Sequence, residues 1–180
     1  MSRTVKALFI LALLCLSAYY LVVLYLARHP DVSYAYRMYY LEMKTRYWNR
    51  NQTLAYIPGY RFDMVNDRAW ILSRQGWTLP KDDGSGTEFT GRGGLYFTLH
   101  RVPTALRLVA EVRNMQPNNQ LTLRIGAWQQ DVVLKEKGPQ RLIVPLPTDT
   151  LVADPLEANH IEMQSLAPIR FQTMMIDNGE

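Results

Sequence analysis

The feature that most constrains this chain is an uncharged apolar run near its N-terminus, ALFILALLCLSAYYLVVLYLA, residues 7–27. An α-helix of this length rises about 30 Å, which matches the hydrocarbon thickness of a bilayer. Signal peptides have shorter apolar cores, of roughly 7 to 15 residues, and small residues before the cleavage point. Because the bulky Tyr25 stands where a small residue is needed, we predict an uncleaved transmembrane anchor.

The flanks of the run predict its orientation. Arg3, Lys6 and the terminal amine precede it, and Arg28 and Asp31 follow it. Positive charge before a first helix favours a cytoplasmic N-terminus, and long C-terminal domains are translocated largely regardless of their charge. We therefore expect a single-pass protein of a bacterial inner membrane, with residues 1–6 in the cytoplasm and the body of the chain in the periplasm.

Residues 28–60 are predicted to form a membrane-proximal, aromatic, helical linker. Pro30 ends the anchor helix, and Asp31 is placed to cap a second helix over 31–50. Aromatic and apolar residues recur there at steps of three and four, as in an amphipathic helix. Such a helix can lie in the lipid headgroup region, pack on the following domain or pack on another membrane protein. The candidate partner-binding residues are Tyr36, Tyr39, Tyr40 and Tyr47.

Basic residues concentrate in this same region. Residues 28–61 hold six Lys or Arg against two acids, whereas residues 62–180 hold twelve against fourteen. The basic excess is therefore adjacent to the predicted anchor, where a lipid bilayer is a more natural partner than nucleic acid. The body of the chain has no basic, aromatic-interleaved motif of a nucleic-acid module, so we expect no nucleic-acid partner.

Beyond residue 61 the periodicity changes from helical to alternating. Short runs with apolar residues at every second position are separated by turns rich in Gly, Pro and Asn. These runs are GLYFTLHRV, ALRLVAEVRNM, QLTLRIGAW, DVVLKE, QRLIVPLP, NHIEMQSL and IRFQTMMID. Half-buried strands without helices between them predict a mainly β domain over 61–180, an antiparallel jelly-roll-like β-sandwich preceded by the transmembrane helix and a short amphipathic helix.

The sequence offers few groups for catalysis or metal binding. His29, His100 and His160 lack a second ligand at zinc spacing. The chain has no nucleophile elbow, zinc-protease motif or Walker loop. The only cysteine, Cys15, lies inside the apolar run, so it is neither an exported nucleophile nor half of an exported disulfide. We therefore predict no catalytic residue, no metal and no cofactor.

The most unusual window is GWTLPKDDGSGTEFTGRGG, residues 76–94, where acids and glycines lie between apolar segments. Its acids are candidates for contact with a cation or another ligand, or for the carboxylate pair of a small hydrolase. The alternative is a structural turn whose glycines supply positive φ angles. Trp77 has apolar neighbours and is expected in the core, whereas Trp128 precedes the polar turn QQD. The candidate ligand-binding residues are Asp82, Asp83, Glu88 and Trp128.

The order of residues in this window resembles a known family, the β-sandwich module attached to membrane phosphoglycerol transferases and some glycosyltransferases of Gram-negative envelopes. The resemblance covers about residues 70–165 and is carried by GWT (76–78), Pro80, FTG (89–91) and LYFTL (95–99), followed by the same rhythm of strands. Lys81 stands where the family has an acid, and Phe89 where it usually has Trp. The family's closing Ser-Pro and Asp-x-Arg elements are missing, so no ligand specificity is transferred.

The resemblance implies a non-catalytic domain that accompanies an enzyme making or modifying envelope glycans. With the anchor, it leads to the hypothesis of a membrane-anchored periplasmic accessory subunit that contacts an integral-membrane enzyme and its glycan. One alternative is a structural interaction protein of an envelope complex, which docks through the membrane-proximal helix. Another alternative is a small carboxylate-dependent hydrolase.

Overall fold

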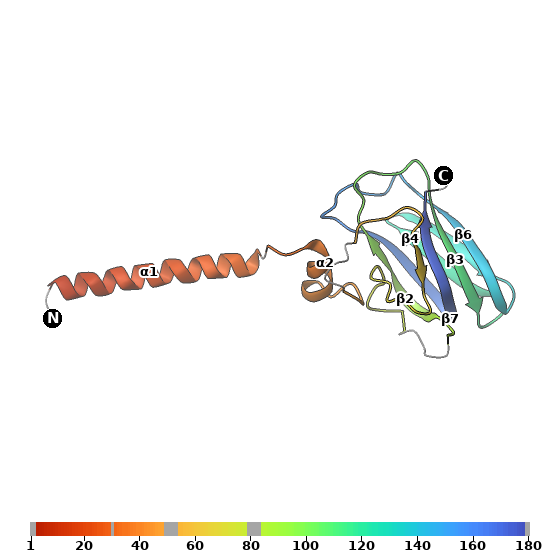
Figure 1. Cartoon of the computed structure of the whole chain (residues 1–180), viewed down its shortest axis with the longest axis horizontal. Helices are drawn as coiled ribbons and strands as arrows, with labels where there is room; N and C mark the ends of the chain where they lie inside the picture. Colours follow the sequence, from red (N-terminus) through yellow and green to blue (C-terminus); the bar gives the residue numbers. More distant parts are fainter. Residues whose placement is uncertain (1–2, 30, 49–53, 79–83, 179–180) are drawn as a thin grey trace. The chain divides into compact units, whose positions relative to one another are not determined.

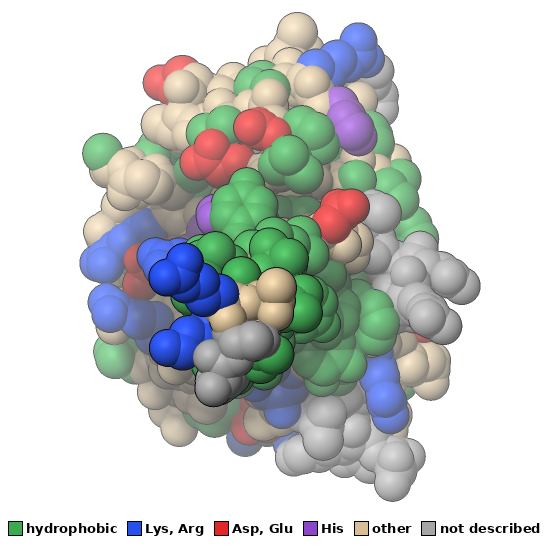
Figure 2. All heavy atoms as spheres, turned by 90° about the vertical axis from the view of Figure 1, so that its left-hand side faces the viewer, with side chains coloured by type: hydrophobic (Ala, Val, Ile, Leu, Met, Phe, Trp, Pro, Cys, Tyr) green, Lys and Arg blue, Asp and Glu red, His purple; other side chains and the backbone are tan. Residues whose placement is uncertain are grey.

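The computed structural model describes residues 3–29, 31–48, 54–78 and 84–178, in two compact units, Met1–Ser33 and Tyr34–Glu180. The first unit contains the helix α1 (Arg3–Arg28), which is long and apolar enough to cross a membrane and has no buried residue. Figure 2 views the chain from the side of α1, and the side chains nearest the viewer are mostly hydrophobic with a small basic group. The predicted span, 7–27, lies wholly within this helix.

The second unit is mainly β, as the alternating runs predict, and Figure 1 shows its strands gathered in one body. All pairings between its strands are antiparallel, within one curled seven-stranded sheet. The strands are β1 (Arg61–Asp63), β2 (Thr87–Phe97), β3 (Leu106–Asn114), β4 (Asn119–Ile125), β5 (Trp128–Leu134), β6 (Gly138–Leu146) and β7 (Asn159–Asp177). The predicted antiparallel β fold behind an N-terminal apolar helix is therefore confirmed.

The nineteen-residue strand β7 joins the two halves of this sheet. Its first part, up to Ser165, pairs with β2 on one edge and β4 on the other. Its second part, from Ile169, pairs with β2 and then β1 on one edge and with β3 on the other. Strands β5 and β6 extend the two halves outward from β4 and β3. One strand therefore belongs to both halves, and the sheet curls around it.

The sequence suggested two strands, NHIEMQSL and IRFQTMMID, where the structure has only β7. The register with β2 shifts between Phe89 and Gly91, opposite Ile169 and Ser165, so β7 has extra residues at this point. Such a bulge bends a strand without ending it. Pro168 lies within the bulge, where the missing N–H of proline does not cost a ladder hydrogen bond.

The core is built from the alternate side chains of these strands, and Trp77 is part of it. Its indole is 3% exposed, as expected from its apolar neighbours. The ring centroids of Phe89 and Phe171 lie 4.8 Å and 5.0 Å away, and the indole N–H donates to the carbonyl oxygen of Gly94 at 3.1 Å. The indole therefore buries its apolar surface while its polar atom keeps a partner.

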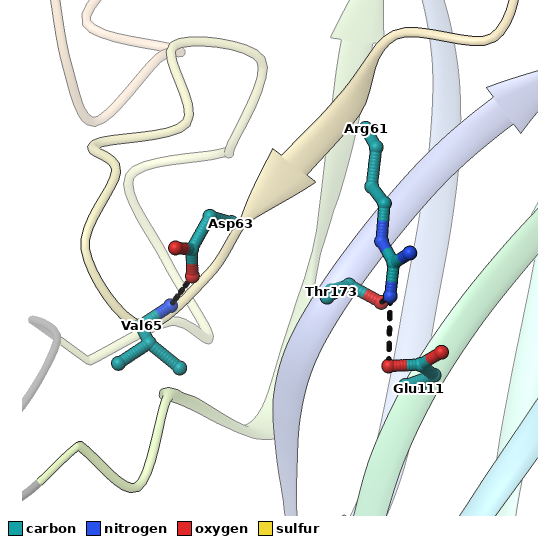
Figure 3. Close-up of polar contacts among 5 residues, drawn as sticks. All are labelled: Arg61, Asp63, Val65, Glu111 and Thr173. Atoms are coloured by element: carbon teal, nitrogen blue, oxygen red, sulfur yellow. Dashed lines mark hydrogen bonds and ion pairs between the residues drawn. The ribbon is translucent and has the colours of Figure 1, made fainter.

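The short strand β1 is held on the sheet by side chains as well as by its backbone. Arg61 donates from Nη2 to Glu111 Oε2 at 2.9 Å and to Thr173 Oγ1 at 3.4 Å, so it reaches across β7 to β3 (Figure 3). At the other end of β1, the carboxylate of Asp63 accepts the Val65 N–H at 2.9 Å (Figure 3). The Arg61–Glu111 pair is largely solvated, so it adds little to the free energy of unfolding. Its main effect is to fix the position of β1 relative to β3.

The predicted helix over 31–50 is much shorter in the structure. It consists of α2 (Tyr34–Tyr36) and one π-helical turn, η1 (Arg37–Leu41). Met43 then adopts a φ of 52°, a left-handed conformation that interrupts a helix. The chain continues as an extended segment, and Thr45 forms an antiparallel bridge with Ser73. Sequence periodicity did not reveal the change from helix to extended backbone, because the residue that pairs with this segment, Ser73, lies far along the chain.

The extended segment belongs to the sheet because residues 71–78 cover the free edge of β2. The Ser73 N–H donates to the Gly94 carbonyl at 2.9 Å, and the Tyr96 N–H donates to the Ile71 carbonyl at 2.8 Å. The Arg46 N–H in turn donates to the Leu72 carbonyl at 2.8 Å. Covering an edge satisfies backbone groups that would otherwise be open to association. Residues from Tyr34 onward therefore form one compact unit with the strands.

Gly84 and Gly86 provide a matched test of the turn before β2. Both have positive φ angles, 69° and 86°, but a Cβ at Gly84 meets nothing within 4 Å, whereas a Cβ at Gly86 would overlap the carbonyl oxygen of Phe171. We expect Gly84→Ala to lower the free energy of unfolding by about 1 to 2 kcal/mol, from backbone strain alone. Gly86→Ala should cost about 1 to 3 kcal/mol more, because β7 must move.

The measurement is denaturant unfolding of the full chain in neutral detergent micelles, followed by the strand signal in circular dichroism. Equal losses in the two variants would contradict the tight packing of Gly86 against β7.

Candidate functional site

A partly exposed aromatic cluster lies at the start of the second unit. It consists of Tyr36, Tyr39, Tyr40 and Trp48, with ring centroids 4.6 Å apart for Tyr36 and Tyr40 and 5.3 Å apart for Tyr40 and Trp48. The guanidinium of Arg74 lies 5.4 Å from the centre of the Tyr39 ring and donates to the Tyr39 carbonyl at 3.1 Å. This cation–π contact fixes the cluster to the segment that covers β2.

The structure brings together three of the four predicted partner-binding tyrosines. Tyr47 is the exception, because its partly buried ring packs against the hydrophobic core. Trp48, which the helical spacing did not indicate, takes its place in the cluster. Trp48 joins the cluster in place of Tyr47 because the backbone here is extended, and consecutive side chains of an extended backbone point to opposite sides. The structure therefore places Trp48, rather than Tyr47, beside the three clustered tyrosines, and the partner-binding role of Tyr47 stays a prediction.

A polar groove with a volume of about 270 Å³ crosses the outer face of β4, β5 and β7. Thr122 donates to Asp131 Oδ1 at 2.7 Å, and Gln129 Nε2 donates to the same oxygen at 3.4 Å. The Nε of Arg124 donates to the side-chain oxygen of Gln129 at 2.9 Å. The residues that line the groove are Gln120, Thr122, Arg124, Gln129, Asp131, Gln164 and Leu166.

The groove orders its polar groups through pairs that face each other across strands. Thr122 is directly opposite Asp131, and Arg124 is directly opposite Gln129. The hydrogen bond from Thr122, and a further one from Gln120, hold the pKa of Asp131 below its usual range. The carboxylate therefore stays ionised at neutral pH and acts as a hydrogen-bond acceptor.

Two of the predicted ligand-binding residues, Trp128 and Glu88, are described, and neither lines this groove. Trp128 is on β5, but its partly buried ring packs on the core, whereas the exposed Gln129 and Asp131 occupy the alternate positions that face outward. Glu88, on the outer side of β2, pairs with Arg170, with 3.2 Å between Glu88 Oε2 and Arg170 Nε. Asp82 and Asp83 lie outside the described residues.

Sequence reasoning identified the polar faces of these strands but not the groove. Thr122 and Arg124 are recognisable as the polar alternation of LTLRI, and Gln129 and Asp131 follow a short turn. The turn residue Gly126, with a φ of 56°, sets the hairpin register that places the two pairs together. The groove could have been predicted by pairing LTLRI with the run that begins at Trp128 as a β-hairpin across Gly126.

Titratable clusters suited to metal binding are missing from the part of the chain that the structure describes. In those residues, no three His, Cys, Asp or Glu side chains lie close enough together to hold a metal ion. The described carboxylates of the groove and of β2, Asp131 and Glu88, are instead engaged by hydroxyl, amide and guanidinium groups.

No family model matches the chain, and no curated protein matches it. Among solved structures, a ruminal GH26 endo-β-1,4-mannanase is 10% identical, with a TM-score of 0.40, and the match covers 69% of this chain and 27% of the mannanase chain. The uncharacterized protein lmo2446 from Listeria monocytogenes is 16% identical, with a TM-score of 0.34, covering 47% of this chain and 8% of that chain.

A second structure of the Listeria protein, in complex with glucose, magnesium and calcium, is 13% identical, with a TM-score of 0.35. It covers 57% of this chain and 10% of that chain. This chain therefore spans only a small part of each of these proteins. Likenesses at such TM-scores carry no functional argument. The resemblance to the module of phosphoglycerol transferases stays a prediction.

The hydrogen bond between Thr122 and Asp131 can be tested by titration. Thr122→Val keeps the shape of the side chain and removes the donor, so the pKa of Asp131 should rise toward its usual value of about 3.9. Because the folded pKa is lowered, this bond contributes to stability above the pKa of the unfolded chain and is lost as the pH falls through the folded pKa.

The measurement is a carboxyl ¹³C NMR titration of the full chain in micelles. Asp63 is the internal control, because the hydrogen bond from Asn66 lowers its pKa independently of Thr122. An unchanged pKa for Asp131 in the variant would show that Thr122 does not order the groove.

Proposed function

We propose that this protein is a membrane-anchored, non-catalytic accessory subunit of a membrane enzyme that makes or modifies cell-envelope glycans. In this proposal α1 spans the inner membrane with its N-terminus in the cytoplasm, and the β-sandwich contacts the glycan in the periplasm. The observation that carries the proposal is one chain that joins an apolar helix without buried residues to a sandwich with an ordered polar groove. Such a helix needs lipid or protein around it.

The chemistry of the groove suits saccharide hydroxyls. Each hydroxyl both donates and accepts, and the groove supplies acceptors on Asp131 and Gln129 and donors on Arg124 and the amide groups. These side chains are already held in place by one another, which reduces the entropy lost on binding. Leu166, which lines the groove and is 84% exposed, offers an apolar surface for the C–H groups of a sugar ring.

The same geometry favours binding over hydrolysis. A glycosidase needs one carboxyl group that is protonated when the substrate arrives and a second one at roughly 5 to 9.5 Å. The donors around Asp131 lower its pKa and favour the ionised form. Glu88 is held by Arg170 on a different pair of strands. In the proposed complex the partner enzyme supplies the chemistry, and the anchor keeps the groove at high effective concentration beside it.

Glycan contact through the groove predicts that removing its central acceptors abolishes binding. The double variant Gln129→Ala/Asp131→Ala should weaken binding of envelope oligosaccharides at least about tenfold, since the two acceptors at the centre of the groove are lost together. The measurement is calorimetry with the full chain in micelles, using oligosaccharides released from Gram-negative envelopes.

The matched control is Gln116→Ala/Asp149→Ala, which removes the same residue types at exposed positions outside the groove. The glycan proposal is wrong if none of the oligosaccharides binds the unmodified chain, or if both double variants behave alike.

A docking role is the second candidate, and the exposed side of the aromatic cluster favours it. Tyr40 is 45% exposed and the adjoining Leu41 is 53% exposed. Only residues 29–33 separate this unit from the end of α1 in the sequence. Apolar side chains on a surface of this kind are typical of protein interfaces. A partner that lies in or on the same membrane is therefore the natural occupant.

The docking role predicts that Tyr40→Ser/Leu41→Ser reduces recovery of a membrane partner severalfold after cross-linking in native membranes, because the exposed apolar surface is lost. Val152→Ser/Leu156→Ser is the matched control, since these residues are 41% and 70% exposed and lie outside the cluster. Oligosaccharide affinity should not change in either variant. Equal recovery from both variants would exclude docking through the cluster.

A further inference from the structure

A second hollow, with a volume of about 270 Å³, lies between the outer face of β2 and β7 and the segments that cover it. We name it the basic hollow. Its charged and aromatic lining residues are Lys44, Arg74, Arg92, Tyr96, His160 and Glu162. The lining thus has three cationic side chains against one carboxylate. None of these residues belongs to the polar groove of β4, β5 and β7.

The cations of the basic hollow come from three different segments. The extended segment after η1 contributes Lys44, whose carbonyl accepts the Arg74 N–H at 2.8 Å. Arg92 lies on β2, and its Nε is 2.9 Å from Oε1 of Glu162 on β7. The backbone pairing that covers the edge of β2 therefore also brings Lys44 and Arg74 to the side of Arg92.

Existing ion pairs leave the cations able to take a further anion. Lys44 Nζ is 2.7 Å from Glu42 Oε2, and this contact with Glu42 raises the pKa of Lys44, so the ammonium form is favoured. Even with Glu42 included, cations exceed carboxylates by three to two. The Arg92 side chain is 65% exposed and uses Nε in its ion pair. The guanidinium carries five N–H donors in a planar fork, the geometry that matches an oxyanion.

The floor of the basic hollow is a stacked pair, Tyr96 on β2 and His160 directly opposite on β7. Their ring centroids are 4.2 Å apart and their planes differ by only 6°. A Cβ on Gly94 would overlap the backbone carbonyl oxygen of Ile161 and stand 2.8 Å from His160 Nε2, so a glycine lets β2 lie close to β7 and to the imidazole. Burial lowers the pKa of His160, and Lys44 acts in the same direction while Glu162 opposes it. The floor is therefore a flat stacked surface that is largely uncharged at neutral pH.

We propose that the basic hollow binds the oxyanion of a phosphate ester between Lys44 and Arg92, above the Tyr96–His160 pair. Guanidinium and ammonium groups are the side chains that bind phosphate oxygens most strongly. Two sources present this chemistry, the headgroup of an anionic phospholipid and a soluble phosphate ester. The inference goes beyond the proposed function, because it involves neither the polar groove nor the glycan.

The test titrates the full chain in neutral detergent micelles with dihexanoylphosphatidylglycerol and with glycerol 1-phosphate. Dihexanoylphosphatidylcholine, which has no net charge, is the comparison ligand. The readout is the ring-proton NMR signal of His160, assigned by its disappearance in His160→Gln. A bound anion beside the imidazole favours its protonated form, so the pKa of His160 should rise on binding.

The double variant Lys44→Gln/Arg92→Gln should weaken binding about tenfold or more, since two charged hydrogen-bond donors are lost. Arg113→Gln/Lys135→Gln removes the same charge at exposed positions outside the hollow and should leave the affinity unchanged. Arg92→Gln alone serves if the double variant does not fold, because this exposed residue lies outside the core.

Binding of both anionic ligands, lost in the hollow variants, supports a phosphate site that is open to soluble esters. Binding of phosphatidylglycerol alone, lost in the same variants, supports the site and identifies the lipid headgroup as its source. The inference is overturned if neither anion shifts the His160 signal, if phosphatidylcholine binds as strongly as phosphatidylglycerol, or if the charge-matched control loses as much affinity as the hollow variants.

Discussion

The backbone pairing along β7 is the constraint on which the rest of the β unit depends. Its first part carries β4 and β5, and its second part carries β3 and β6, while β2 and β1 occupy the opposite edge. The bulge around Pro168 bends the strand between these parts. Because one strand serves both halves, the core closes without a separate connection between them, and the polar groove lies where β4, β5 and β7 share an outer face.

A second consequence follows from the edge of β2. Residues 71–78 cover that edge, and the extended segment around Thr45 covers them in turn. The aromatic cluster and the basic hollow are therefore attached to the sandwich by backbone hydrogen bonds, and Arg74 contributes to both. An aromatic segment adjacent to a predicted membrane span is in this way built into the β unit, which gives both proposed surfaces a rigid support.

The strands were predictable because each one carries its own alternation of apolar and polar residues. Alternation in LRLVAEV and LTLRI depends only on which face is buried, and the structure places Leu108, Val112 and Leu123 inside. Trp77 was likewise predictable from its apolar neighbours. The predicted helix over 31–50 is longer than the observed one, and the spacing did not indicate Trp48. The segment takes its extended conformation from pairing with Ser73, which no local periodicity reveals.

By itself the sequence determined an apolar helix of membrane length, a mainly β unit behind it, and the inward face of most strands. These properties follow from hydrophobic length and period, which are local. Only the tertiary structure decided that β7 is one strand and that the compact unit begins at Tyr34. It also decided that Thr122 hydrogen-bonds to Asp131 and that Lys44 and Arg92 line the same hollow. The physical reason is that such meetings depend on register and edge pairing between distant segments, which no single stretch of sequence encodes.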